Sequence, residues 1–205
     1  MSLRNKSIIL ILLILVFDQA VKFWIKTHMT IGDEYGVFGN WFIIHFTENN
    51  GMAFGIEFWG KFGKLFLSLF RIVAICAIGY YIYQLVKQKA NTGLVLGISA
   101  IMAGAIGNLI DSAFYGLIFS DSLSETAKLF PAGGGYSSFL HGKVVDMLYF
   151  PIINTTYPEW IPWVGGQHFV FFSPVFNLAD SAITTGVFYL LIFQRRVLLG
   201  KHEEE

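Results

Sequence analysis

Long apolar runs, separated by shorter polar segments, dominate the pattern along the chain. Each run is about 20 residues long, which is the length that an α-helix needs to cross a bilayer. The pattern predicts four membrane-spanning helices, at residues 8–27, 65–86, 94–114 and 174–194. The first run follows a short basic start, as in a secretory signal peptide, but no small-x-small cleavage site follows it, so we expect an uncleaved span.

The expected fold class is therefore an all-α membrane protein, with a single integral-membrane domain over residues 1–205. The remaining segments are external at 28–64 and 115–173, with a charged tail at 195–205. Within the first external segment, residues 41–46 are typical of a strand and residues 48–51 of a turn. A lone strand cannot cross hydrocarbon because its backbone would stay unpaired. We expect a small β segment on the membrane surface, followed by a short amphipathic helix near Gly60.

Positive charges mark one side of the predicted bundle. They lie at both ends of the chain and between the second and third runs, at Arg4, Lys6, Lys87, Lys89, Arg195, Arg196 and Lys201. The positive-inside rule then predicts four helices with both termini in the cytoplasm. Polar residues from five separate segments consequently fall at the opposite, non-cytoplasmic face: Asp18, Asn49, Asp111, Asp146 and Asp180.

The composition agrees with a membrane protein. The chain is 55% hydrophobic and only 14% charged, whereas soluble domains carry about 25% charged residues. Its net charge is zero, so no basic excess favours nucleic-acid binding. The single cysteine, Cys76, lies in an apolar run, and we expect a small buried hydrophobe there because an apolar setting raises the thiol pKa.

The candidate chemistry is carried by two aspartates. Asp146 lies in the sequence Val-Val-Asp-Met and Asp180 in Phe-Asn-Leu-Ala-Asp. A charge at bilayer depth costs about 2.5–3.5 kcal/mol, so a charged residue kept there is a functional candidate. If the fold brings the two together, they share one proton and their pKa values are driven apart. One could then activate water while the other polarises a carbonyl, as in an aspartic peptidase.

Other hydrolytic machinery finds no support in the sequence. The five histidines show no His-Glu-x-x-His spacing, and no Gly-x-Ser-x-Gly setting occurs, so we expect neither a metal nor a cofactor. Paired carboxylates alone fit a proton-coupled transporter equally well. Clustering of the aspartates at one face and the absence of an internal repeat argue against that alternative. A noncatalytic assembly protein of the envelope is a second alternative.

Two helical runs carry further polar positions. In the third run, Gly104, Asn108 and Asp111 share one face, and the small residues of this run favour close helix packing. In the first run, Asp18 and Lys22 are four residues apart. A structural ion pair and a substrate-facing role both remain open for these two residues.

Five ordered blocks of the sequence resemble a known family, the lipoprotein signal peptidases (signal peptidase II). The blocks are Asp18-Gln19-Ala20-Val21-Lys22, Asn49-Asn50-Gly51-Met52-Ala53-Phe54, Gly104 with Asn108-Leu109-Ile110-Asp111, Gly142-Lys143-Val144-Val145-Asp146, and Phe176-Asn177-Leu178-Ala179-Asp180. Their order and their places on the four-span plan match the family over nearly the whole chain.

The resemblance implies an aspartic endopeptidase of the bacterial inner membrane. Such an enzyme removes the signal peptide from prolipoproteins that carry diacylglycerol on the lipobox cysteine, cutting before that cysteine. Its partners are prolipoproteins and membrane lipids, and globomycin, a cyclic peptide, inhibits it. Asp146 and Asp180 match the catalytic pair. The positions that match substrate-binding residues are Asn49, Gly104, Asn108, Asp111, Asn177, Asp18 and Lys22.

The chain departs from the family pattern in two places. Many members have Arg where this chain has Ser112, so the cation expected there is either absent or supplied by another residue. The second departure is the segment between Gly116 and Gly142, which is 25 residues long where members often have only a residue or so. A lid, a partner site and a plain surface loop are all open for this insertion.

Overall fold

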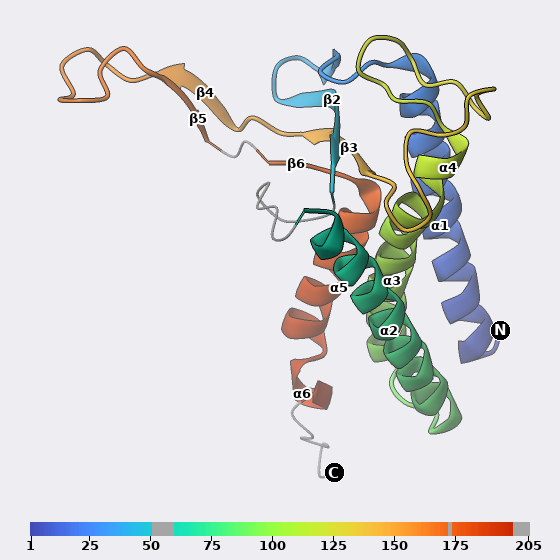
Figure 1. Cartoon of the computed structure of the whole chain (residues 1–205). Helices are drawn as coiled ribbons and strands as arrows, with labels where there is room; N and C mark the ends of the chain where they lie inside the picture. The colour runs from blue at the N-terminus through green and yellow to red at the C-terminus, as the bar shows by residue number, and fades with distance from the viewer. Residues whose placement is uncertain (51–59, 172–173, 199–205) are drawn as a thin grey trace.

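Four helices form the body of the molecule (Figure 1). The computed structural model describes residues 1–50, 60–171 and 174–198. The helices of the body are α1 (Leu3–His28), α2 (Gly60–Lys87), α3 (Thr92–Ile110) and α5 (Leu178–Phe193). Among the described residues, three helical segments are long and apolar enough to cross a membrane, namely Leu3–His28, Phe62–Lys87 and Thr92–Ile118. The shorter α5 has 16 residues.

Helix α3 lies at the centre, in contact with α1, α2 and α5. Its small residues permit this arrangement, as the sequence predicted. A Cβ atom at Gly97 would come within 2.7 Å of Leu190 of α5, and one at Gly104 would overlap the carbonyl oxygen of Ala179. These glycines therefore set how closely α3 and α5 approach.

The ends of the helices follow local capping signals. Ser2 caps α1 by accepting a hydrogen bond from the Asn5 amide, and the Asn91 side chain caps α3. At its other end, α3 continues into a π-helical turn, η2 (Asp111–Tyr115), and a short helix, α4 (Gly116–Ile118). After α5 the chain continues into the short α6 (Arg195–Leu198).

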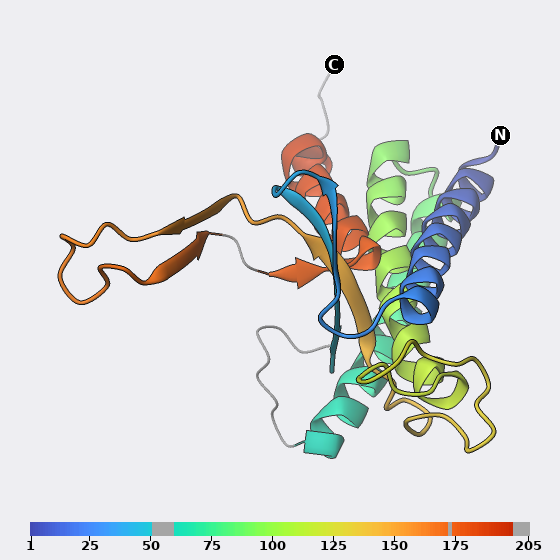
Figure 2. The ribbon, with the colours of Figure 1, turned by 90° about the horizontal axis from the view of Figure 1, so that it is seen from above.

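A four-stranded antiparallel sheet covers one end of the bundle (Figure 1). Its strands, in spatial order, are β1 (Glu34–Phe38), β2 (Phe42–Asn49), β3 (Val144–Tyr149) and β6 (Val175–Phe176). Two further strands, β4 (Ile153–Thr156) and β5 (His168–Phe171), form a hairpin arm that extends away from the bundle (Figure 2). The β structure therefore exceeds the predicted surface segment, because β3, β4 and β5 lie in the external segment 115–173, for which no strand was predicted.

Several predicted boundaries need correction. The strand predicted at 41–46 is confirmed, but the turn predicted at 48–51 is wrong for Glu48 and Asn49, which pair with β3 inside β2; Gly51 lies outside the described residues. The helix expected near Gly60 is the start of α2 itself. The fourth helix begins at Leu178, four residues later than predicted, because the preceding residues pair with β3 as strand β6.

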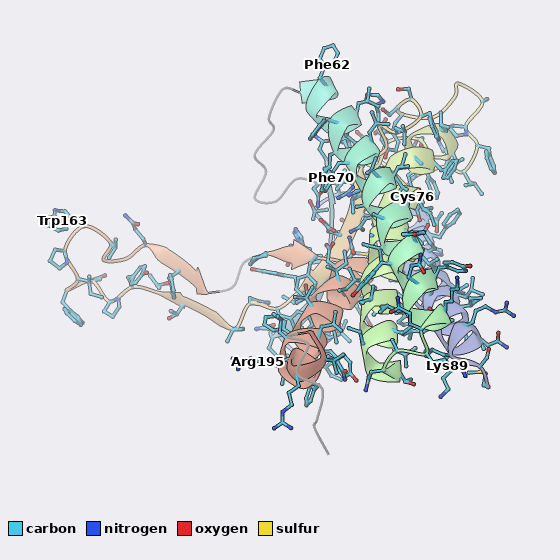
Figure 3. The ribbon with its side chains drawn as sticks, turned by 90° about the horizontal axis from the view of Figure 1, so that it is seen from below. Phe62, Phe70, Cys76, Lys89, Trp163 and Arg195 are labelled. Carbon is cyan, nitrogen blue, oxygen red and sulfur yellow. The ribbon has the colours of Figure 1, made fainter. Side chains whose placement is uncertain are left out.

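The outer faces of the helices are strongly apolar. Leu13, Val16 and Phe17 of α1 are all more than 60% exposed, and such continuous apolar surface is typical of contact with lipid. Phe62, Phe70 and Cys76 lie along α2 (Figure 3). Cys76 is exposed, so the expectation that it is buried is wrong. In a bilayer, an apolar residue can face outward.

The 25-residue insertion packs against the sheet end of the bundle. The amide of Ile31 donates to the carbonyl of Ser122, and the amide of Ala127 donates to the carbonyl of Lys26, each at 2.9 Å. The amide of Lys143, the residue before β3, donates to the Tyr136 hydroxyl at 2.7 Å. These bonds fix the insertion to the end of α1 and to the entry of β3.

Candidate active site

The two predicted aspartates come from different elements at the sheet end of the bundle. Asp146 lies in β3, and Asp180 lies in the first turn of α5. Asn177 caps α5: its side-chain oxygen accepts a hydrogen bond from the Asp180 amide at 2.8 Å, and the Asp180 carboxylate accepts one from the Asn177 amide at 3.5 Å. This capping box fixes Asp180 at the helix N-terminus.

Two amide side chains join the aspartates. Asn177 donates from Nδ2 to Asp146 Oδ1 at 2.7 Å and to Asn108 Oδ1 at 3.1 Å. Asn108 in turn donates from Nδ2 to Asp180 Oδ1 at 2.8 Å. Asn49 Nδ2 also donates to Asp146. The structure therefore brings five of the predicted site residues into one hydrogen-bonded group.

The environment of Asp146 favours its protonated form. The residue is only 2% exposed, and burial, followed by the negative charge of Asp180, raises its pKa to about 7. The hydrogen bonds from Asn177 and Asn49 lower this pKa, as does the charge of Lys22, but they do not cancel the rise. Asp146 is therefore suited to carry a proton near neutral pH.

A buried ion network lies next to this pair. Lys22 Nζ is 3.0 Å from Asp18 Oδ2 and 2.8 Å from Asp111 Oδ2, and it donates to Asn108 Oδ1 at 3.2 Å. Asp18 Oδ1 accepts a hydrogen bond from the Ala179 amide at 2.9 Å. Because buried charges are tolerated only when they are paired, the network ties α1 to η2 and α5. The Asp18–Lys22 ion pair is thus present, and the substrate-facing role of both residues stays a prediction.

Asp111 connects the helices to the sheet. It opens the π-helical turn η2, and its Oδ2 atom accepts a hydrogen bond from the Val145 amide at 3.3 Å. Val145 directly precedes Asp146, so this contact sets the position of β3 over the bundle. Gly104, the remaining predicted residue, lies one helical turn before Asn108 and allows α5 to pack closely there.

Comparison with known proteins identifies the family. The family model described as signal peptidase (SPase) II matches residues 10–195. The chain belongs to the signal peptidase II family. It is 53% identical to the lipoprotein signal peptidase of Porphyromonas gingivalis over 190 residues, which cover 92% of this chain and 82% of that protein. It is 40% identical to the lipoprotein signal peptidase of Amoebophilus asiaticus over 187 residues, 90% of this chain and 75% of that one.

A solved structure supports the same family assignment. It is described as a bacterial membrane enzyme, and it superposes on the chain with a TM-score of 0.65 at 28% identity, covering 98% of this chain and 94% of that one. Members of the signal peptidase II family are membrane proteases, so the chain is a member of a protease family.

Sequence reasoning did not assign roles to Gln19 and Lys26 in this member of the signal peptidase II family. Gln19 Nε2 donates to Asp18 and to Asp111, at 3.1 and 3.0 Å. Lys26 Nζ is 2.6 Å from Glu48 Oε1, and both side chains are buried. Glu48 precedes Asn49, so this ion pair holds β2 against α1. A sequence signal existed for Lys26, since it follows Lys22 by one helical turn.

Arg71 is the other residue that sequence reasoning left without a role. Its Nη1 atom donates to Ser112 Oγ at 3.1 Å, and Asp180, Asp111 and Asp146 all act electrostatically on its guanidinium group. A cation from α2 therefore reaches Ser112, where the family resemblance led us to expect one. The sequence signal was a single charge within the apolar run 65–86.

A cavity of about 430 Å³ lies elsewhere in the bundle, between α1 and α2. Its polar lining comes chiefly from Arg4, Ser7 and Lys87, and it contains no carboxylate that could act as an acid or base. Within residues 1–50, 60–171 and 174–198, no group of three or more His, Cys, Asp or Glu side chains is arranged to hold a metal ion. The candidate active site is the group at the sheet end in which Asn177 and Asn108 join Asp146 to Asp180.

Proposed function

We propose that the chain is a membrane-embedded aspartic endopeptidase that removes the signal peptide from diacylglyceryl-modified prolipoproteins, cutting before the lipidated cysteine. Membership of the signal peptidase II family supports signal-peptide removal from prolipoproteins. The observation that carries the aspartic mechanism is the linkage of Asp146 to Asp180 through Asn177 and Asn108. Two carboxyl groups held in this way, one with a raised pKa, have the properties of an acid–base pair.

The proposed reaction uses one proton shared by the pair. The ionised carboxylate takes a proton from water as the water oxygen attacks the scissile carbonyl, while the protonated carboxyl donates a hydrogen bond to the carbonyl oxygen. In the tetrahedral intermediate, a proton passes from the pair to the leaving amide nitrogen, and the carbon–nitrogen bond breaks. The pair returns to its starting state with one proton. Asn177 and Asn108 keep the carboxyl groups at a fixed separation throughout.

We propose that four helices span the bacterial inner membrane, with both termini in the cytoplasm and the active site at the periplasmic face. The N-terminus, α6 and the α2–α3 connection lie at the same end of the bundle, opposite the sheet (Figure 1). With 16 residues, α5 is about 24 Å long, shorter than the hydrocarbon core of about 30 Å. Asp180, at its start, would then lie slightly inside the outer boundary, where the end of a signal helix arrives.

The remaining predicted residues would support substrate binding in different ways. We propose that Asn49, Asn108 and Asn177, which contact the aspartates, line the substrate pocket together with Asp111 and Gly104. Asp18 and Lys22 would support this lining, since Lys22 pairs with both Asp18 and Asp111 and donates to Asn108. Globomycin would block the same pocket, and membrane lipids would surround it. The segment of the chain at 51–59 lies outside the described residues.

The decisive experiment adds purified protein to a diacylglyceryl-modified prolipoprotein in detergent and follows the mass shift, with and without globomycin. Asp146→Asn and Asp180→Asn should each abolish cleavage without unfolding the protein, because an isosteric amide removes the charge repulsion. Glu125→Gln serves as the control, since Glu125 is exposed in the insertion. Normal turnover by either aspartate variant would refute the mechanism. Uptake of a solute by proteoliposomes, without peptide cleavage, would favour the proton-coupled transporter instead.

A further inference from the structure

Lys26 is a buried cation whose partners come from β2 and from the insertion (residues 117–141). It lies near the end of α1 and is fully buried. Its Nζ atom is 2.6 Å from Glu48 Oε1 and donates to Ser122 Oγ at 2.7 Å. The ring of Tyr136 faces the same ammonium group, with its centroid 5.0 Å from Nζ. Because a buried charge is tolerated only when it is paired and hydrogen-bonded, Lys26 depends on the insertion as well as on β2.

The insertion is itself bonded to the backbone on both sides of this cation. The amide of Ala127 donates to the carbonyl of Lys26 at 2.9 Å. The Tyr136 hydroxyl accepts a hydrogen bond from the amide of Lys143 at 2.7 Å, and Lys143 Nζ is 3.6 Å from Glu48 Oε2. Glu48 is thus held by two cations, one at each carboxylate oxygen, and the Tyr136 ring lies near both cations. The insertion therefore contacts every charged group of this cluster or its immediate backbone.

Strand β2 carries the ion pair on one face and an active-site contact on the other. Glu48 and Asn49 are adjacent in β2, and both pair with residues of β3. Successive side chains of a strand point to opposite faces. Glu48 accordingly points to Lys26, whereas the Asn49 side chain donates to Asp146. Any movement of Glu48 relative to α1 would therefore move Asn49 relative to the aspartate.

We propose that the insertion is a positioning element of the active site, which acts through Ser122 and Tyr136. These two residues complete the surroundings of Lys26. Lys26 in turn fixes β2, so that the Asn49 amide stays on Asp146. The insertion then belongs to the framework of the site, rather than forming a lid or a plain surface loop. The proposal rests on the proposed function, because the contact that it maintains is made to one of the two aspartates.

The test compares Ser122→Ala with Ser124→Ala, which is the same substitution at an exposed position of the insertion. Both kcat and KM are measured on a diacylglyceryl-modified prolipoprotein. A hydrogen bond to a charged group changes an equilibrium constant by about 10-fold at the low end of its range, so Ser122→Ala should lower kcat about 10-fold. KM should stay nearly unchanged, because the pocket residues on α3 and α5 keep their places. Ser124→Ala should cleave like the wild type.

Hydrogen exchange separates positioning from a general loss of stability. In Ser122→Ala, the amides of β2 should exchange about 10-fold faster, whereas those of α3 and α5 should keep their wild-type protection. Tyr136→Leu removes the ring next to Lys26 and the acceptor for the Lys143 amide, and it should give the same local increase and the same fall in kcat. Equal loss of protection in every helix of Ser122→Ala overturns the proposal. A kcat equal to that of Ser124→Ala, or a loss of cleavage confined to KM, also overturns it.

The outcome for the insertion can be told apart from the outcome for the proposed function. The proposed function fails if the wild type does not cleave the lipidated precursor or if the aspartate variants remain active. Hydrogen exchange tests the link from Ser122 to β2 without any substrate. The proposal for the insertion fails by itself if the wild type cleaves, the aspartate variants do not, and Ser122→Ala matches Ser124→Ala in kcat and in the exchange of β2.

Discussion

Substitution of Asn177 tests the link between the two aspartates most directly. Its side chain makes two separable sets of hydrogen bonds. The oxygen caps α5 by accepting from the Asp180 amide, and the nitrogen donates to Asp146 and to Asn108. Asn177→Ala removes both the cap and the two donated hydrogen bonds. Asn177→Ser keeps a capping oxygen, because Ser is a good N-cap residue, but removes the amide donor.

The expected magnitudes follow from these contacts. Loss of an N-cap costs about 1 kcal/mol, and loss of each buried side-chain hydrogen bond costs about 1 kcal/mol. Asn177→Ala should therefore destabilise the protein by about 3 kcal/mol and Asn177→Ser by about 2 kcal/mol. For a chain of this size, 1 kcal/mol shifts Tm by about 2–4 °C, so the Ser variant should melt about 2–4 °C above the Ala variant.

The assay combines thermal unfolding in detergent with cleavage of the lipidated precursor. Both variants should lose cleavage, because Asp146 would no longer be held to the network that reaches Asp180. The reasoning is refuted if Asn177→Ser both cleaves at the wild-type rate and melts at the wild-type temperature. That combination would mean that Asn177 acts only as a helix cap.

Two more predictions concern stability. The pKa of Asp146 is raised to about 7, against about 3.9 in an unfolded chain. The contribution of Asp146 to the free energy of unfolding is therefore full below about pH 4 and is lost as the pH rises through about 7. Tm measured from pH 4 to 8 should show this loss in the wild type but not in Asp146→Asn. Gly104→Ala should lower Tm by about 6–12 °C, because its Cβ would overlap the backbone oxygen of Ala179 and overpacking costs about 3 kcal/mol at the upper end. Gly133→Ala, where a Cβ would meet open space, should leave Tm unchanged.

The sequence predicted the first three helices within a few residues because their limits depend on local properties. An apolar run of bilayer length and a capping residue such as Ser2 or Asn91 can be recognised without knowing the rest of the fold. The start of α5 could not be recognised in this way. Val175 and Phe176 are apolar like a helix, but pairing with β3 makes them a strand, and that partner is distant in the sequence.

For the site too, some features could be predicted from the sequence and others could not. The aspartates and asparagines could be selected because polar residues are costly in an apolar setting and because the sequence blocks resemble a family. Contacts between elements could not be predicted from the sequence, and Arg71 is an example. Its partner Ser112 lies on another helix, and the contact depends on the relative rotation of α2 and α3. The predicted burial of Cys76 was wrong because burial of apolar residues is a rule for proteins in water.

The buried charges explain why function and folding are joined at this end of the molecule. In lipid, apolar helix faces gain little from meeting each other, so packing and polar contacts must hold the bundle together. Asp18, Lys22 and Asp111 provide such contacts between α1, η2 and α5, and all three are fully buried. Variants of these residues should therefore lose structure and activity together, whereas Asp180, which is only partly buried, offers a position at which chemistry can be changed while the fold remains.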